Sequence, residues 1–205
     1  MSRLRVAVFL DWQNVYKAAR RTFGWQTWPN EYGNFSPYGL ADLIASRNDR
    51  GLQRELCRVE IHRGLPDSTR DPVGHGACRR QSAAWMNENP ELVIPRLRSL
   101  RYPQEWPDLP PQEKGVDVQL ALGLLESVIS EACDVAVLFS NDSDLLPVIE
   151  AVQRLKGPAS IETAAWWADE TSPRLRTKGR VFHHKLLLDD FQAVERRINY
   201  AHPSP

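Results

Sequence analysis

Residues Asp134–Val152, DVAVLFSNDSDLLPVIEAV, decide the fold of this chain. The run Val135–Phe139 has the length and apolar composition of a strand that is buried on both faces. An acidic tip with Asp142 and Asp144 follows, and then a helical pattern. Open α/β sheets bind their ligands at the carboxyl ends of their strands. We therefore expect the acidic tip to contribute to a cation site at such an edge.

The rest of the chain alternates strand-like and helix-like segments in the same way. We expect strands at Arg5–Leu10, Leu52–His62, Leu92–Tyr102, Asp134–Ser140 and Ala159–Trp166, and helices at Gln13–Thr22, Tyr38–Ser46, Cys78–Glu88, Gly115–Ala132, Leu145–Lys156 and Asp190–Asn199. Gly64–Gly76 and the proline-rich Pro103–Gln112 are expected to be loops. This alternation predicts an α/β fold, a three-layer αβα sandwich with a mostly parallel central sheet of about five strands.

Length and composition indicate one globular unit. With 205 residues, 42% hydrophobic and 25% charged, the chain suits a single domain over residues 1–205. Its core is expected at about 5–191, with a short C-terminal extension. Three widely spaced cysteines fit neither a disulfide framework nor a zinc site. The net charge is zero, so nucleic-acid binding would have to come from a local patch.

The sequence also carries expectations about location. A membrane span requires about 18 or more consecutive apolar residues, and the chain has no such run. The first apolar stretch is too short for a secretory signal and leads directly into Asp11. We therefore expect a cytoplasmic protein that does not interact with a membrane.

Two further acids lie where a strand ends or a helix begins. Asp11 follows the first expected strand, where it can also be a helix N-cap. Asp117 shares a helical stripe with apolar residues, and this stripe is expected to face the sheet. A buried carboxylate without a partner is costly, so Asp117 needs a cation. Lys114 is one candidate partner, and a metal ion is the other.

These acids are expected to converge. Helix capping explains either Asp142 or Asp144, but it explains both poorly. Crossovers in a parallel sheet bring Asp11, Asp117 and the acidic tip to one edge, where the carboxylates would repel one another without bound cations. Oxygen-only ligands favour Mg²⁺ or Mn²⁺. Phosphodiester hydrolysis is the chemistry that most often uses such a cluster.

Three segments resemble a known family. They are Phe9–Asn14 (FLDWQN), Lys114–Val118 (KGVDV) and Ser140–Leu145 (SNDSDL), and together they are similar to the NYN domain of the PIN-like nuclease superfamily. The segment Ser172–Asp189 is similar to the end of LabA-like bacterial members. The resemblance implies metal or catalytic roles for the four aspartates, and the supporting residues expected around them are Asn14, Ser140, Asn141 and Lys114. The chain departs from the family pattern at Asn141, where glycine is common, and at the bulky Trp12.

The resemblance implies a metal-dependent endoribonuclease acting on single-stranded or structured RNA. A catalytically weak or inactive RNA-binding or regulatory module is the alternative. Two other Mg²⁺ phosphotransfer folds fit less well. A haloacid-dehalogenase-type phosphatase expects DxD on the first strand, where this chain has Asp11-Trp12-Gln13, and a Toprim domain expects a glutamate after that strand.

Two further segments carry expectations about partners. Thr171–Lys185 contains five cations and no acid, so it is the best candidate for an RNA-binding patch, with a solvated loop as the alternative. Its proposed RNA-binding residues are Arg174, Arg176, Lys178 and Arg180. The aromatic-rich loop Phe23–Pro37 can stack bases, form a small satellite core or make a dimer contact. A homodimer is therefore one possible assembly.

Overall fold

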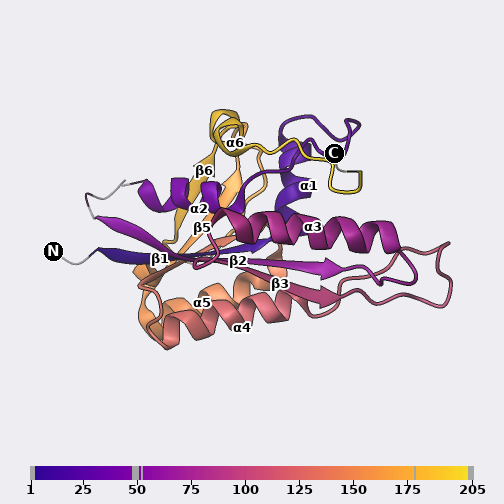
Figure 1. Ribbon diagram of the computed structural model, residues 1–205. Helices are drawn as coiled ribbons and strands as arrows, with labels where there is room; N and C mark the ends of the chain where they lie inside the picture. Colours follow the sequence, from indigo (N-terminus) through magenta and orange to yellow (C-terminus); the bar gives the residue numbers. More distant parts are fainter. Residues whose placement is uncertain (1–2, 48–50, 52, 178, 203–205) are drawn as a thin grey trace.

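The computed structural model describes residues 3–47, 51, 53–177 and 179–202. They contain a six-stranded sheet with helices around it (Figure 1). The strand order is β3-β2-β1-β4-β5-β6, and every neighbouring pair is parallel. The strands are β1 (Leu4–Asp11), β2 (Arg54–Leu65), β3 (Val93–Ser99), β4 (Val135–Phe139), β5 (Ile161–Trp166) and β6 (Phe182–Leu186). The parallel α/β sheet is confirmed, and the expected number of strands was one too few.

Helices cover both faces of this sheet, which confirms the three-layer arrangement. They are α1 (Trp12–Thr22), α2 (Pro37–Ser46), α3 (Pro72–Glu88), α4 (Val116–Ile129), α5 (Leu146–Lys156) and α6 (Leu188–Val194), with short 3-10 turns at Ser143–Leu145 and Pro158–Ser160. Helices α1, α2, α3 and α6 pack on one face, and α4 and α5 pack on the other (Figure 1). Within the described part of the chain, no helix combines the length and apolar character that a membrane crossing requires.

The central strand β1 shows why an unbroken apolar run forms this sheet. Val6, Val8 and Leu10 belong to the core cluster that contains α1, α2 and α3. Ala7 and Phe9 belong to the cluster that contains α4 and α5. All five side chains are completely buried, because successive residues of a strand point to opposite faces and both faces are covered. The apolar run therefore places its first polar residue at the sheet edge.

Three sequence expectations need correction. Helix α3 begins at Pro72 rather than Cys78, because Asp71 caps it by accepting a hydrogen bond from the Gly74 N–H at 2.8 Å. The expected loop Gly64–Gly76 is therefore wrong at both ends, because β2 runs to Leu65 and α3 begins at Pro72. Strand β6, FHHKL, was missed because it lies at the sheet edge and is too polar to read as a buried strand. Helix α6 ends at Val194, well before Asn199.

This topology fixes where polar residues can gather. Strands β1 and β4 are neighbours at the centre of the sheet and run in the same direction, with Leu10 beside Phe139. The residues that follow these two strands therefore lie side by side at the carboxyl edge. Helix α4 contacts both strands and β2, and it starts near that same edge. Segments far apart in the sequence meet there.

Candidate metal centre

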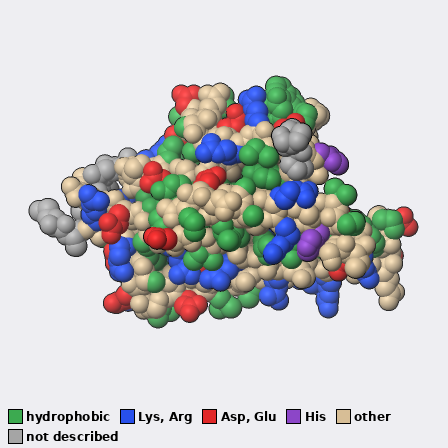
Figure 2. Space-filling view, viewed as in Figure 1, with side chains coloured by type: hydrophobic (Ala, Val, Ile, Leu, Met, Phe, Trp, Pro, Cys, Tyr) green, Lys and Arg blue, Asp and Glu red, His purple; other side chains and the backbone are tan. Residues whose placement is uncertain are grey.

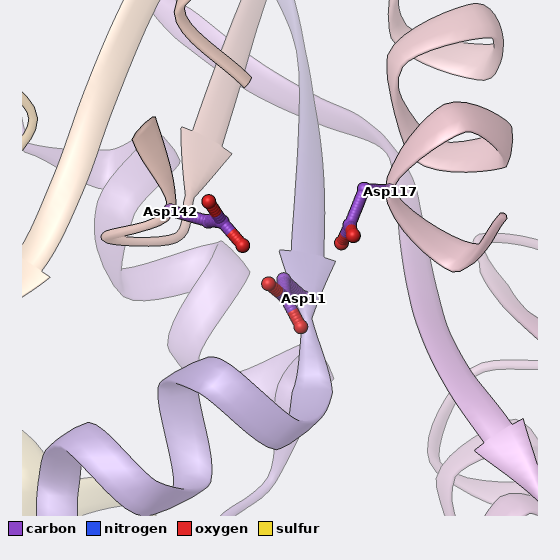
Figure 3. Close-up of side chains that lie close together, drawn as sticks. All are labelled: Asp11, Asp117 and Asp142. Atoms are coloured by element: carbon purple, nitrogen blue, oxygen red, sulfur yellow. The ribbon is translucent and has the colours of Figure 1, made fainter. Parts of the chain in front are cut away.

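Three carboxylates meet at the carboxyl edge of the sheet. Asp11 ends β1, Asp142 follows β4, and Asp117 lies in the first turn of α4. One carboxylate oxygen from each lies within 4.8 Å of the other two. Figure 3 shows the three side chains pointing toward one another from three separate elements. This geometry shows the convergence that the sequence predicted for these three acids.

Asp11 is the most buried of the three, with 5% of its surface exposed. It caps α1 by accepting a hydrogen bond from the Asn14 N–H at 3.3 Å, and the Ser140 hydroxyl donates to its other oxygen at 3.0 Å. Burial raises the pKa of Asp11 to about 7, although both hydrogen bonds oppose this shift. The charges of Asp117 and Glu113 raise the pKa further. The capping role and the place in the cluster therefore belong to the same side chain.

Asp117 is half-buried rather than fully turned inward. The apolar stripe of α4 does face the sheet, since Leu120 and Leu124 are completely buried, but Asp117 in the first turn of the helix is only partly covered. Burial raises its pKa, and the charges of Asp142 and Asp144 add to this. Gly115, the N-cap of α4, has a φ of 76°, a left-handed conformation that glycine adopts readily.

Lys114 is not seen to neutralise Asp117. Its side chain is exposed, and its carbonyl oxygen accepts a hydrogen bond from the Arg98 Nε–H at 2.7 Å. The ion pairs found among the described residues do not include one between Lys114 and Asp117. The cation expected beside Asp117 is therefore not supplied by this lysine.

The two acids after β4 occupy different positions. Asp142 accepts a hydrogen bond from the Asp144 N–H at 2.9 Å and so caps the short turn Ser143–Leu145, while its carboxylate also belongs to the three-acid cluster. Asp144 is exposed and lies outside that cluster, but its charge still raises the pKa of Asp117. The catalytic role assigned to Asp144 from its motif position stays a prediction.

The supporting residues tie the strand ends together. Besides donating to Asp11, the Ser140 hydroxyl accepts a hydrogen bond from the Asp142 N–H at 3.0 Å. The Asn14 side-chain oxygen accepts from the Asn141 N–H at 2.9 Å. Asn141 does not have a positive φ, so a side chain at this glycine-favouring position requires no backbone strain. Its own buried Oδ1 has no hydrogen-bond partner among the described residues.

Trp12, the other departure from the family pattern, turns away from the carboxylates. It is buried on the α1 face of the sheet, with its ring centroid 4.3 Å from that of Trp85 and 4.9 Å from that of Phe35. The bulk of this residue therefore fills the core. Phe35 itself belongs to this main core, and not to the small satellite core that was one interpretation of the aromatic loop.

The described cationic residues of the basic segment Thr171–Lys185 do not lie together at one edge of the sheet. Arg174 lies 5.8 Å from the ring centroid of Trp167, which directly follows β5 at the carboxyl edge. Arg180 lies two residues before the start of the parallel strand β6, so it lies at the opposite edge. Arg176 is exposed, and Lys178 lies outside the described residues. Cationic and acidic side chains are interspersed over the face in Figure 2, so phosphate binding has to depend on local groups.

Sequence reasoning missed two polar residues beside the cluster. Glu113 belongs to the loop before α4; its carboxylate accepts a hydrogen bond from the Gly64 N–H at 2.6 Å, and its charge contributes to the raised pKa of Asp11. His62 is the register partner of Asp11 on β2. Neither belongs to a recognisable motif, and only the pairing of β1 with β2 would have placed His62 there.

The donor set of the cluster fits a hard divalent cation. The three oxygens come from carboxylates, which suit Mg²⁺ or Mn²⁺ better than zinc. The raised pKa values of Asp11 and Asp117 show that their own surroundings stabilise the negative charge poorly. A cation held by Asp11, Asp117 and Asp142 would reverse this effect.

One comparison with known proteins identifies a family. A family model described as the NYN domain matches residues 5–183. A crystal structure of a protein of unknown function from Vibrio parahaemolyticus is similar, with 20% identity over 80% of this chain and 81% of that chain and a TM-score of 0.47. A comparison with curated proteins finds no match.

Proposed function

This chain belongs to the NYN domain family, and we propose that it is a metal-dependent ribonuclease that hydrolyses RNA phosphodiester bonds. The family implies a PIN-like nuclease fold, and the matched region covers most of the chain. One observation supports the proposal above all others: three carboxylates from three elements have oxygens within 4.8 Å of one another at the carboxyl edge of the sheet.

Each residue of the cluster has a definite task in this proposal. Asp11, Asp117 and Asp142 hold Mg²⁺ or Mn²⁺ through their facing oxygens. When bound, such an ion acidifies a water molecule and neutralises the charge that develops on the phosphate. Ser140 fixes the distance between two of the ligands, because its hydroxyl donates to Asp11 and accepts from the Asp142 N–H. Asn14 fixes the loop after β4 through the Asn141 N–H.

Substrate binding is expected on the same edge of the sheet. Of Arg174, Arg176 and Arg180, Arg174 is best placed to hold the RNA backbone, since it packs beside Trp167 at the end of β5. A guanidinium group binds phosphate through two parallel hydrogen bonds. Arg180, at the opposite edge, would contact only RNA that extends across the molecule.

The proposal is tested by cleavage of a labelled single-stranded RNA with Mg²⁺ or Mn²⁺ and with EDTA. The wild-type protein should cleave with either metal, EDTA should stop cleavage, and Asp142→Asn should be inactive. Asp189→Asn removes an exposed acid on α6 and is the matched control. Equal cleavage by the wild type and Asp142→Asn would contradict the proposal. Metal-dependent RNA binding without cleavage would favour the regulatory module instead.

A further inference from the structure

Arg63 of β2 is a partly buried cation whose charge has no close counterpart. Its guanidinium lies 5.9 Å from the ring centroid of Trp85, and one terminal N–H donates to the side-chain oxygen of Gln81. Its Nε is completely buried and has no hydrogen-bond partner among the described residues. Within the same part of the chain, no carboxylate lies within ion-pair distance of Arg63.

Such an arrangement is unusual for an arginine in a protein interior. Burial lowers the pKa of Arg63, so its surroundings disfavour the charge. Buried arginines normally pair with a carboxylate, as Arg54 does with Glu162 at 2.8 Å in this structure. Gln81 is neutral and is itself engaged, because its amide donates to Asn34 at 3.1 Å. Arg63 therefore has unused capacity to bind an anion.

Two hollows meet at Arg63. The first has a volume of about 300 Å³ and is also lined by Gln13, Lys17 and Glu113. The second, about 290 Å³, is also lined by Gln13, together with Tyr16, Glu31 and Asn199 among others. Arg63 and Gln13 are common to both, so one ligand can occupy the two hollows and contact Arg63 between them.

The chemistry of the two hollows differs in a way that suits the two parts of a nucleotide. The first contains two cations, Arg63 and Lys17, against one carboxylate, and therefore favours a phosphate. The second contains Glu31 and the Tyr16 ring, which is stacked against Trp12 with a centroid distance of 6.2 Å and has the Arg20 guanidinium over it at 5.6 Å. The edge of this ring offers a base an apolar contact, and Glu31 would repel a phosphate but accept hydrogen bonds from an amino group of a base.

None of the three acids lines either hollow, but both hollows are lined by residues near Asp11. Gln13 comes two residues after Asp11 at the start of α1, and Glu113 is close enough to raise the pKa of Asp11. A nucleotide bound at Arg63 would therefore lie next to the metal ligands, on the side of the sheet edge away from β4. A chain that passes through both sites would place a neighbouring phosphate at the carboxylates.

We propose that Arg63 and Lys17 hold the phosphate of a nucleotide adjacent to the one that is cut, while its base occupies the second hollow against Tyr16. The choice of RNA as the ligand rests on the proposed function. Because a base inserted into a protein hollow cannot remain paired, this subsite selects single-stranded RNA over a duplex.

The subsite is tested by titrating AMP, CMP, GMP and UMP into the protein in EDTA, with binding followed by nuclear magnetic resonance. Wild type should bind at least one nucleotide saturably, and Arg63→Met and Lys17→Met should each weaken binding about tenfold. Arg154→Met removes an exposed cation near the end of α5 and should bind as wild type. Lys17 is exposed, so Lys17→Met decides the question if thermal denaturation shows that Arg63→Met does not fold.

Absence of saturable binding by wild type would overturn this inference, and so would equal binding by Lys17→Met and Arg154→Met. EDTA removes divalent metal from the assay, so the result is independent of cleavage. Nucleotide binding that depends on Arg63, without any cleavage of RNA, would support the subsite and contradict the ribonuclease proposal. If the wild type cleaves RNA but both variants bind nucleotide as tightly as the wild type, the subsite is contradicted and the ribonuclease proposal is not.

Discussion

Two buried carboxylates on the same face of the sheet have opposite electrostatic environments. Asp11 ends β1, and Glu60 lies one strand away on β2, in register with Phe9. Glu60 is only 2% exposed, and burial alone would raise its pKa. Hydrogen bonds from His62 at 3.1 Å and from Arg96, together with Arg58, lower that pKa to about 2. The pKa of Asp11, in contrast, is raised to about 7.

The difference lies in what the chain supplies around each group. Glu60 is surrounded by cationic side chains of β2 and β3, and Glu162 is likewise matched by Arg54 and His184. Asp11 accepts hydrogen bonds from Asn14 and Ser140, but the charges of Asp117 and Glu113 raise its pKa further. In the proposed metal site, the cation that balances this buried carboxylate comes from solution. Glu60 and Glu162, which have cationic partners, stabilise the sheet. Asp11, which has none among the described residues, belongs to the candidate site.

The largest expected effect is on catalysis. Asp117→Asn or Asp142→Asn should lower kcat/KM for RNA at least about 100-fold, because each removes one of the charges that hold the metal. Asp144→Asn should lower it by less than about tenfold, since Asp144 is exposed and lies outside the three-acid cluster. Steady-state kinetics with Mn²⁺ would measure all three. A larger loss for Asp144→Asn than for Asp117→Asn would reverse the assigned roles.

Neutralising the two buried carboxylates should change the free energy of unfolding in opposite directions. Glu60→Gln should lower the free energy of unfolding by about 2–3 kcal/mol, because it leaves partly exposed arginines without their carboxylate. Asp11→Asn should raise that free energy by about 1–3 kcal/mol at pH 8 without metal, since it removes a buried charge and keeps an N-capping oxygen. Urea unfolding of the metal-free proteins measures both. Destabilisation by Asp11→Asn would contradict this comparison.

The pH dependence should show the same contrast. A carboxyl whose pKa rises from 3.8 to about 7 on folding binds more protons in the folded state, so stability falls as pH rises through that interval. Glu60 has a lowered pKa, so its contribution is complete above its ordinary value of 4.5 and is lost only as pH falls toward about 2. Metal-free wild type should therefore lose stability between about pH 4 and 7 relative to Asp11→Asn. Stability profiles that run parallel for the two proteins would contradict a raised pKa of Asp11.

The smallest effect is expected at the residue that links the ligands. Ser140→Ala removes the hydroxyl between Asp11 and the Asp142 N–H, leaving both groups without this partner. The free energy of unfolding should fall by about 1 kcal/mol, and Mn²⁺ affinity should fall about tenfold. Calorimetric titration with Mn²⁺ measures the affinity. An unchanged affinity would mean that Ser140 does not position the ligands.

The local sequence was sufficient to place three of the acids. Apolar runs that end abruptly at Asp11 and before Asp142 predicted buried strands with polar ends, and sheet geometry then brought those ends together. The helical stripe predicted which face of α4 packs on the sheet. Each of these inferences depends on a periodicity or a strand end that the sequence displays directly.

Other features depend on how the elements pair, and the local sequence does not encode this. The cations around Glu60 come from two strands, and their match is visible only once β2 lies beside β3. The sequence does not single out Arg63, because only the folded structure shows that its hydrogen-bond partner Gln81 is neutral. The half-exposure of Asp117 follows from where α4 begins relative to the sheet. The polar strand β6 was missed because tertiary pairing outweighed its composition.

The central claim is that the chain leaves a place for a cation between three carboxylates. Crystals soaked in Mn²⁺ and measured for anomalous scattering test this claim most directly. The account predicts one strong peak in contact with oxygens of Asp11, Asp117 and Asp142, and loss of that peak in Asp142→Asn. The absence of a peak at these residues, or a peak held by Asp144 alone, would contradict it.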